Sequence, residues 1–137
     1  MKKEIESNAG LVIKKFQSLT DFKFGFNAQS VKWVDGFLNR IRRNEGFDDN
    51  QKQGLVNTIG SFLGQCIVTC YGGEWGDKDG GPGIRFNEEN WAFPFAKVEK
   101  HLSNGEGDSI YSYFTVIPAV FKGKIGNPEE KSRRKKK

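Results

Sequence analysis

The segment from residue 48 to residue 71 constrains the fold more than any other part of the chain. Asp48, with Gln51 three residues later, has the pattern of a helix-capping box, and two glycines after residue 71 supply a stop. Between these signals, apolar residues fall on most of the helical circumference, at positions 55, 56, 59, 62, 63, 66, 67, 70 and 71. A helix that is apolar on nearly every side is buried on nearly every side. We therefore expect a central helix over about 48–71, with Gly60 and Gly64 on one face, where a neighbouring element can approach closely.

Four further segments carry apolar residues at helical spacing. The first covers about residues 3–19, and the others begin at Ser30, Pro94 and Asp108. Ser30 and Asp108 are good N-cap residues, and proline suits the first turn of a helix. Pro118 is expected to break or kink the last helix, because proline lacks the backbone donor that a helix interior needs.

The pattern changes from helical to β-like after residue 73. Short β-like pieces at 74–76, 84–86 and 91–93 alternate with turn-rich stretches at 77–83 and 87–90. These pieces predict a small antiparallel meander. The fold class that follows is α+β, with about five helices packed on that meander in a single domain over residues 1–121. Twelve Phe, three Trp and three Tyr supply much of the core.

Positive charge is concentrated at the C-terminal end of the chain. Residues 122–137 hold eight Lys and Arg against two Glu, a net charge of +6, whereas residues 1–121 hold 14 basic and 15 acidic residues, a net charge of −1. We expect 122–137 to be a disordered basic tail, because it has few apolar residues to bury. The residues expected to contact a polyanion are Arg133, Arg134, Lys135, Lys136 and Lys137.

Three stretches resemble a family of small, uncharacterised bacterial proteins. They are residues 30–37 (SVKWVDGF), residues 60–75 (GSFLGQ running to YGGEW) and residues 93–111 (FPFAKV running to GEGDSIY). The family signature is an "LGE"-type helix, a "GGEW" turn and a "PFAKV" segment, and Gln65 stands where its acidic residue is expected. The resemblance covers about residues 27–121. It implies a bacterial, cytoplasmic α+β domain with no assigned catalytic residue, and an immunity or accessory role.

Each residue with chemical potential has an ordinary structural interpretation beside it. His101 is the only histidine, so no His-rich metal site can form, and we expect it at the surface or half-buried in its helix. Cys66 and Cys70, four residues apart on a helix, are expected to be buried free thiols in a reducing cytoplasm. Asp77 and Asp79 echo the start of a calcium loop, but Pro82 replaces the glycine such a loop requires, so a hairpin turn is expected.

A binding surface is the remaining hypothesis for the folded part. Trp75, Trp91 and Tyr111, with Glu74 and Arg85 beside them, are candidate partner-binding residues if they line a groove. The alternative is strand alternation, with rings inward and charges outward. The first functional hypothesis is thus a non-catalytic cytoplasmic protein that binds a protein partner, with no metal and no cofactor. A nucleic-acid-associated protein acting through its tail is the second, and a small enzyme using the acidic residues of the 74–79 turn is the third.

Overall fold

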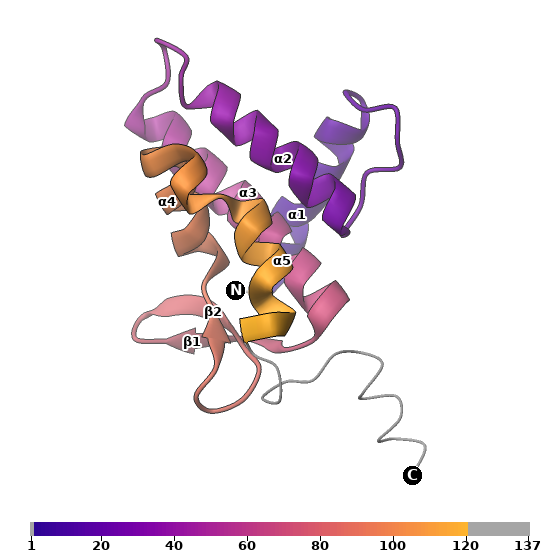
Figure 1. The fold of residues 1–137 in the computed structure, drawn as a ribbon, viewed down its shortest axis with the longest axis vertical. Coiled ribbons are helices and arrows are strands. Elements are labelled where there is room, and N and C mark those ends of the chain that lie inside the picture. The colour runs from indigo at the N-terminus through magenta and orange to yellow at the C-terminus, as the bar shows by residue number, and fades with distance from the viewer. Residues whose placement is uncertain (1, 121–137) are drawn as a thin grey trace.

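The protein folds into five α-helices and one small antiparallel sheet, which confirms the α+β prediction. The structure is a computed structural model and describes residues 2–120. Its elements in chain order are α1 (Lys2–Gln17), α2 (Ala28–Ile41), α3 (Asp49–Tyr71), β1 (Glu74–Lys78), β2 (Gly81–Arg85), β3 (Trp91–Ala92), α4 (Pro94–Asn104), a 3₁₀ turn η1 (Gly105–Asp108) and α5 (Ile110–Val120). The sheet lies at one end of the group of helices, next to the ends of α4 and α5 (Figure 1).

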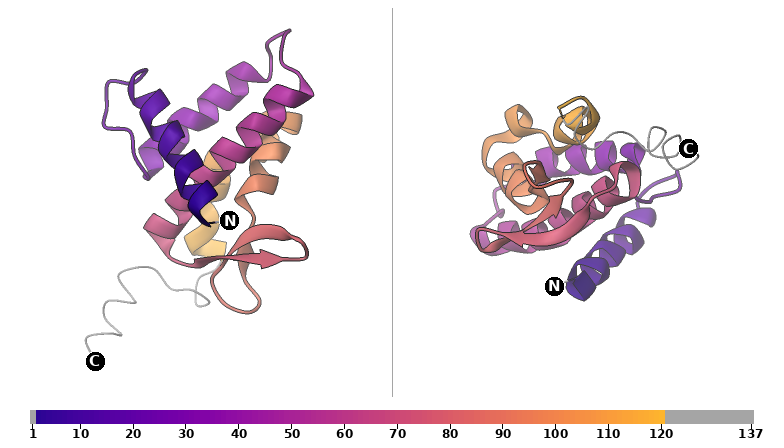
Figure 2. Two further views of the ribbon diagram at one scale, coloured as in Figure 1. Left: turned by 180° about the vertical axis from the view of Figure 1, so that it is seen from behind. Right: turned by 90° about the horizontal axis from the view of Figure 1, so that it is seen from below.

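Helix α3 occupies the centre, as its all-round apolar pattern predicts. Asp48 and Gln51 form the capping box: the Asp48 carboxylate accepts from the Gln51 backbone N–H at 2.9 Å, and the Gln51 side chain accepts in return at 3.2 Å. Helix α1 packs on one side of α3, and α4 and α5 pack on the other, with α2 against α5 (Figure 2). Phe62, in the middle of α3, is fully buried and stacks on Phe24 with ring centroids 5.4 Å apart.

Two glycines of α3 admit large rings from the neighbouring elements. A Cβ at Gly60 would overlap the ring of Phe95, and a Cβ at Gly64 would overlap the indole of Trp75. The indole is fixed there by a hydrogen bond of 2.8 Å from Trp75 Nε1 to Gln65 Oε1. The close approach expected at these glycines is therefore observed. Through it, α4 and β1 pack directly against the central helix.

Several local expectations are wrong in detail. Helix α2 begins at Ala28 with Asn27 as its N-cap, while Ser30 is buried and its Oγ accepts from the Gly25 backbone N–H at 2.9 Å. Leu19 lies beyond the end of α1 and is 61% exposed. Pro118 does not break α5 within the described residues, where the helix runs on to Val120.

The sheet has the strand order β1-β2-β3, and both pairs are antiparallel. The β1–β2 hairpin closes through Asp79 and Gly80, which both have positive φ, at 54° and 85°. Positive φ at both central residues defines the type I′ turn that suits a two-residue hairpin. The hairpin turn expected for the acidic 77–79 stretch is thus present, in place of a calcium loop.

Two points remain, one on membrane-spanning helices and one on the boundary of the domain. No helix within residues 2–120 combines the length and the apolarity needed to cross a bilayer. The predicted boundary between the domain and its basic tail, at residue 121, adjoins residues 121–137, which lie outside the described part, so that boundary stays a prediction.

Candidate binding surface on the three-stranded sheet

The outer face of the sheet, which points away from α3, contains a cross-strand pair of glycines. Directly opposite residues in an antiparallel pair share a face, and side chains alternate along each strand. The register pairs Glu74 with Arg85 and Arg85 with Trp91, so these three residues lie on one face. Trp75, Ile84 and Ala92 lie on the other face, toward the core. On the outer face the next pair along the hairpin is Gly76 opposite Gly83.

Two aromatic rings, those of Trp91 and Phe93, pack against these glycines. The Trp91 ring lies 3.1 Å from the position a Cβ would take at Gly76 and again 3.1 Å from that at Gly83. The Phe93 ring lies 2.9 Å from the same position at Gly83. The two ring planes differ by 10°, with centroids 6.4 Å apart. A side chain at either glycine would collide with a ring, so the glycines are what allow the rings to lie this close to the backbone.

Part of this ring pair remains open to solvent. Phe93 is 38% exposed, and Trp91 is half-buried. Lys78, at the end of β1, places its Nζ 5.4 Å from the Trp91 ring centroid. The Phe93 backbone N–H donates to Tyr113 Oη at 3.3 Å, which joins the strand to α5. Phe93 was not among the residues predicted for the site, although the Trp-Ala-Phe spacing places it on the same face as Trp91.

The structure does not gather the three predicted rings at one groove. Trp75 points inward onto Gly64, whereas Trp91 points outward on the opposite face of the sheet. Tyr111 lies in α5, where Lys32 of α2 places its Nζ 5.9 Å from the ring centroid. Of the five predicted residues, Glu74, Arg85 and Trp91 share a surface, and their role in binding a partner stays a prediction. We define the sheet platform as Trp91, Phe93, Arg85, Glu74 and Lys78.

His101 is fully buried, which corrects its expected surface or half-buried place. Its Nε2 lies 2.6 Å from Asn39 Oδ1, and its Nδ1 accepts from the Ile110 backbone N–H at 3.1 Å. The ring is therefore neutral with its proton on Nε2, because an accepting Nδ1 carries none. Burial lowers the pKa of His101, and the nearby Asp35 carboxylate, 3.8 Å from Nδ1, opposes that shift only in part.

A carboxylate and a hydroxyl accompany this histidine, which sequence reasoning missed. Asp35 Oδ2 accepts from Ser109 Oγ and from the Tyr111 backbone N–H, the latter at 2.9 Å. Ser109 Oγ in turn accepts from the Ser112 backbone N–H at 3.1 Å, as an N-cap of α5 does. The Ser109 hydroxyl thus bonds to the carboxylate and not to the imidazole. The arrangement fixes the start of α5 against α2 and α4, and it lacks the serine-to-histidine bond of a nucleophilic triad.

The two cysteines differ in their surroundings. Cys66 is fully buried, and burial raises its pKa well above the usual value. Cys70 is half-buried, its Sγ lies 3.6 Å from the Phe26 carbonyl oxygen, and burial raises its pKa as well. Both are free thiols, so the prediction of full burial holds for Cys66 and is wrong for Cys70. Within residues 2–120, no three His, Cys, Asp or Glu side chains gather closely enough to hold a metal ion.

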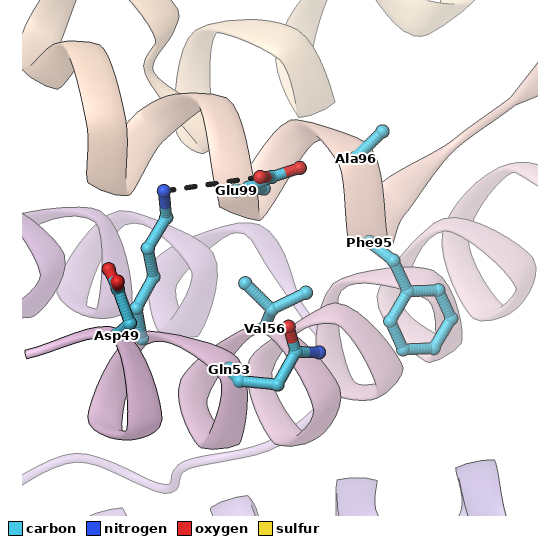
Figure 3. A pocket seen from close by; sticks show the side chains of 7 residues that line it. Asp49, Gln53, Val56, Phe95, Ala96 and Glu99 are labelled. Atoms are coloured by element: carbon cyan, nitrogen blue, oxygen red, sulfur yellow. Dashed lines mark ion pairs between the residues drawn. The ribbon is translucent and has the colours of Figure 1, made fainter.

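A groove beside α4 is crossed by an ion pair. It has a volume of about 340 Å³ between the start of α3 and α4, and Figure 3 shows Asp49, Gln53, Val56, Phe95, Ala96 and Glu99 around it. Lys52 crosses the groove to Glu99 at 3.9 Å and to Ser103 Oγ at 2.6 Å. A second hollow, of about 310 Å³ between α1 and α3, is mostly apolar and includes Leu11, which is 57% exposed.

The five basic residues expected to contact a polyanion, Arg133 to Lys137, lie outside the described residues. Comparison of the chain with protein-family models matched none of them. Comparison with curated proteins found no match, and comparison with solved structures found none either. The bacterial family suggested by the three sequence stretches therefore stays a resemblance.

Proposed function

We propose that this is a non-catalytic protein that binds a protein partner through the sheet platform. The observation that supports it most is the Trp91–Phe93 ring pair, in which both rings pack on Gly83, Trp91 also covers Gly76, and Phe93 is 38% exposed. Exposed aromatic residues beside an arginine have the composition of interface hot spots, in which Trp, Tyr and Arg are enriched. Arg85, on the same face and exposed, completes that composition.

Shielding of the glycines is the structural role that competes with binding. An aromatic ring laid over a cross-strand glycine stabilises a sheet by covering its backbone. That role accounts for the contacts of both rings with Gly83, and it predicts that losing either ring costs folding stability alone. Binding predicts a loss of partner as well, and a hot-spot residue typically costs 2 kcal/mol or more of binding free energy when it is truncated, about a thirtyfold change.

The position of His101 supports the non-catalytic part of the proposal. Both ring nitrogens are engaged with Asn39 and the Ile110 backbone, and the side chain is fully buried. A general base must reach the proton it removes, with a free nitrogen. The enzyme hypothesis then depends on carboxylates of the 74–79 turn, and turnover that is lost in Asp77→Ala or Glu74→Ala would establish it.

A pull-down with matched variants tests the proposal. Full-length protein immobilised and exposed to native lysate should retain a stoichiometric partner, and Trp91→Ser or Phe93→Ser should lose it. Leu19→Ser is the control, because Leu19 is 61% exposed and lies beyond the end of α1, away from the sheet. Circular dichroism and thermal unfolding of each variant separate lost binding from lost folding. Retention of the partner by both folded ring variants contradicts the proposal.

A second candidate function, nucleic-acid association, draws on the charge of the chain. Residues 122–137 carry +6 while residues 1–121 carry −1. Lysines and arginines in such a run displace counterions from a polyanion whatever their conformation.

The resemblance adds a bacterial, cytoplasmic immunity or accessory role to the first proposal, since proteins of that kind act by occupying a partner's surface.

A further inference from the structure

We propose that the sheet platform recognises a lysine- and arginine-rich segment of its protein partner. This inference rests on the proposed function and names the chemistry of the partner. Its basis is the juxtaposition of two solvent-facing rings with carboxylates at both ends of the sheet, in a domain that is otherwise nearly neutral.

The acidic groups are concentrated on the meander. Residues 74–93 hold five carboxylates and two cations, a net charge of −3, whereas residues 1–121 as a whole sum to −1. The five are Glu74, Asp77, Asp79, Glu88 and Glu89, and all are exposed. Within the described part of the chain, none of them lies within 4 Å of a cationic nitrogen, since the ion pairs there involve other acids. Among the residues that the structure describes, the meander therefore presents a net negative charge that no ion pair neutralises.

The rings lie between carboxylates at the two ends of the hairpin. Asp79 is in the turn that joins β1 to β2, and Glu88 and Glu89 are in the β2–β3 loop at the other end of β2, whereas Asp77, opposite Pro82, is on the Trp75 face. Trp91 and Phe93 cover the Gly76–Gly83 pair between these ends. A segment laid along the hairpin thus meets a carboxylate, then aromatic rings, then carboxylates.

Aromatic rings and carboxylates together select cations. A lysine or arginine placed over the face of a tryptophan is attracted by the negative charge of the ring face, and opposite charges nearby add to that attraction. Lys78 demonstrates the geometry within this molecule, with its Nζ 5.4 Å from the Trp91 ring centroid. An incoming arginine can take the same position, since Lys78 is a long side chain at the end of a strand and has rotameric freedom to withdraw.

The same charge distribution disfavours a nucleic acid on this face. Single-stranded nucleic acids stack their bases on aromatic rings, but they need a positively charged groove for the backbone. A local charge of −3 repels phosphates, so the rings here fit a cationic peptide better than a nucleotide. Binding of a nucleic acid through the sheet is one outcome that the test below separates.

The experiment measures binding of three fluorescently labelled peptides of equal length to full-length protein by anisotropy. One peptide is rich in arginine and lysine, the second has glutamate and the third glutamine at the same positions. The cationic peptide should bind most tightly, and its affinity should fall as salt rises from about 50 to 300 mM, because these charges are exposed. Trp91→Leu should weaken binding about fivefold, and Glu88→Gln with Glu89→Gln about threefold.

Matched controls and two contrary outcomes complete the design. The double variant Asp21→Asn and Glu45→Gln removes two exposed carboxylates from the α1–α2 and α2–α3 connections, which lie at the end of the helices opposite the sheet (Figure 1), and should leave affinity unchanged. Equal binding of the three peptides, or tighter binding of a single-stranded oligonucleotide that depends on Trp91, overturns the inference. Replacing residues 133–137 by serine should not alter affinity. A clear gain would show that the chain's own basic end occupies the platform, and would overturn the assignment to a partner. A pull-down that still depends on Trp91 while the cationic peptide fails leaves the proposed function standing and removes only this inference.

Discussion

Replacing Gly64 by alanine tests whether the sheet is fastened to the core through Trp75. Gly64 lies inside α3, and an added Cβ would overlap Cη2 and Cζ2 of the Trp75 indole and lie 3.2 Å from Pro94. The indole cannot retreat freely, because its Nε1 is bonded to Gln65 at 2.8 Å and its ring packs on Phe95 with centroids 5.9 Å apart. We therefore expect the ring to shift by about 1 Å or more and the hydrogen bond to be lost.

The magnitude follows from opposing contributions. Overpacking a well-filled site costs about 1–3 kcal/mol, and a lost hydrogen bond costs about 1 kcal/mol. Alanine in place of glycine inside a helix gains about 1 kcal/mol in return. The net expectation for Gly64→Ala is a loss of about 1–3 kcal/mol of unfolding free energy, with a fall in Tm of several degrees.

Gly54→Ala is the matched control in the same helix. A Cβ at Gly54 meets nothing within 4 Å, so only the helix gain of about 1 kcal/mol applies and Tm should rise. Thermal unfolding followed by circular dichroism gives both shifts. The reasoning is refuted if both variants raise Tm, because Gly64 would then be no more crowded than Gly54.

Three further predictions concern other parts of the chain. Burial lowers the pKa of His101 in the folded state, so below about pH 6.5 the unfolded state binds more protons than the folded state. The contribution of His101 to the free energy of unfolding should therefore be fully present above that pH and fall as the pH drops toward the folded pKa. Urea unfolding at about pH 7.5 and 5.5 should show this loss in the natural protein and not in His101→Gln. Thiol labelling of native protein should modify Cys70 before Cys66 and be slow for both, because each has a raised pKa and Cys66 is fully buried; equal rapid labelling would contradict the assigned burial. If the basic residues 122–137 bind nucleic acid, full-length protein should bind oligonucleotides with a steep salt dependence that deletion of 124–137 abolishes, whereas equal binding by both proteins would place the site on the folded domain.

The sequence predicted the elements better than it predicted which way the strand residues face. Capping residues, apolar spacing and glycine stops located α3 and the other helices, because these signals are local. Alternation implies that Trp91 and Phe93, two residues apart, share a face, but it does not say which face of the sheet that is. Ala92 points inward because it lies directly opposite Ile84, which shares the core face with Trp75. That information lies in β1 and β2, not in the strand itself.

His101 shows the same limit for polar contacts. Its spacing from Val98, three residues earlier, puts it on the buried side of α4, and this signal was available in the sequence. Its partner Asn39 is 62 residues away, in α2. Pairing across such a separation is decided by the packing of whole helices, so neither the burial nor the neutral state of the ring could be derived from local pattern.

Hydrogen–deuterium exchange of the full-length protein, alone and with its recovered partner, tests the central claim most directly. The platform account predicts slower exchange in the partner complex for the backbone amides of β2 and β3, with little change in the α1–α3 hollow around Leu11. Protection of residues 11–16 and 55–59, with exchange in the sheet unchanged, would place the partner on that hollow and contradict the account.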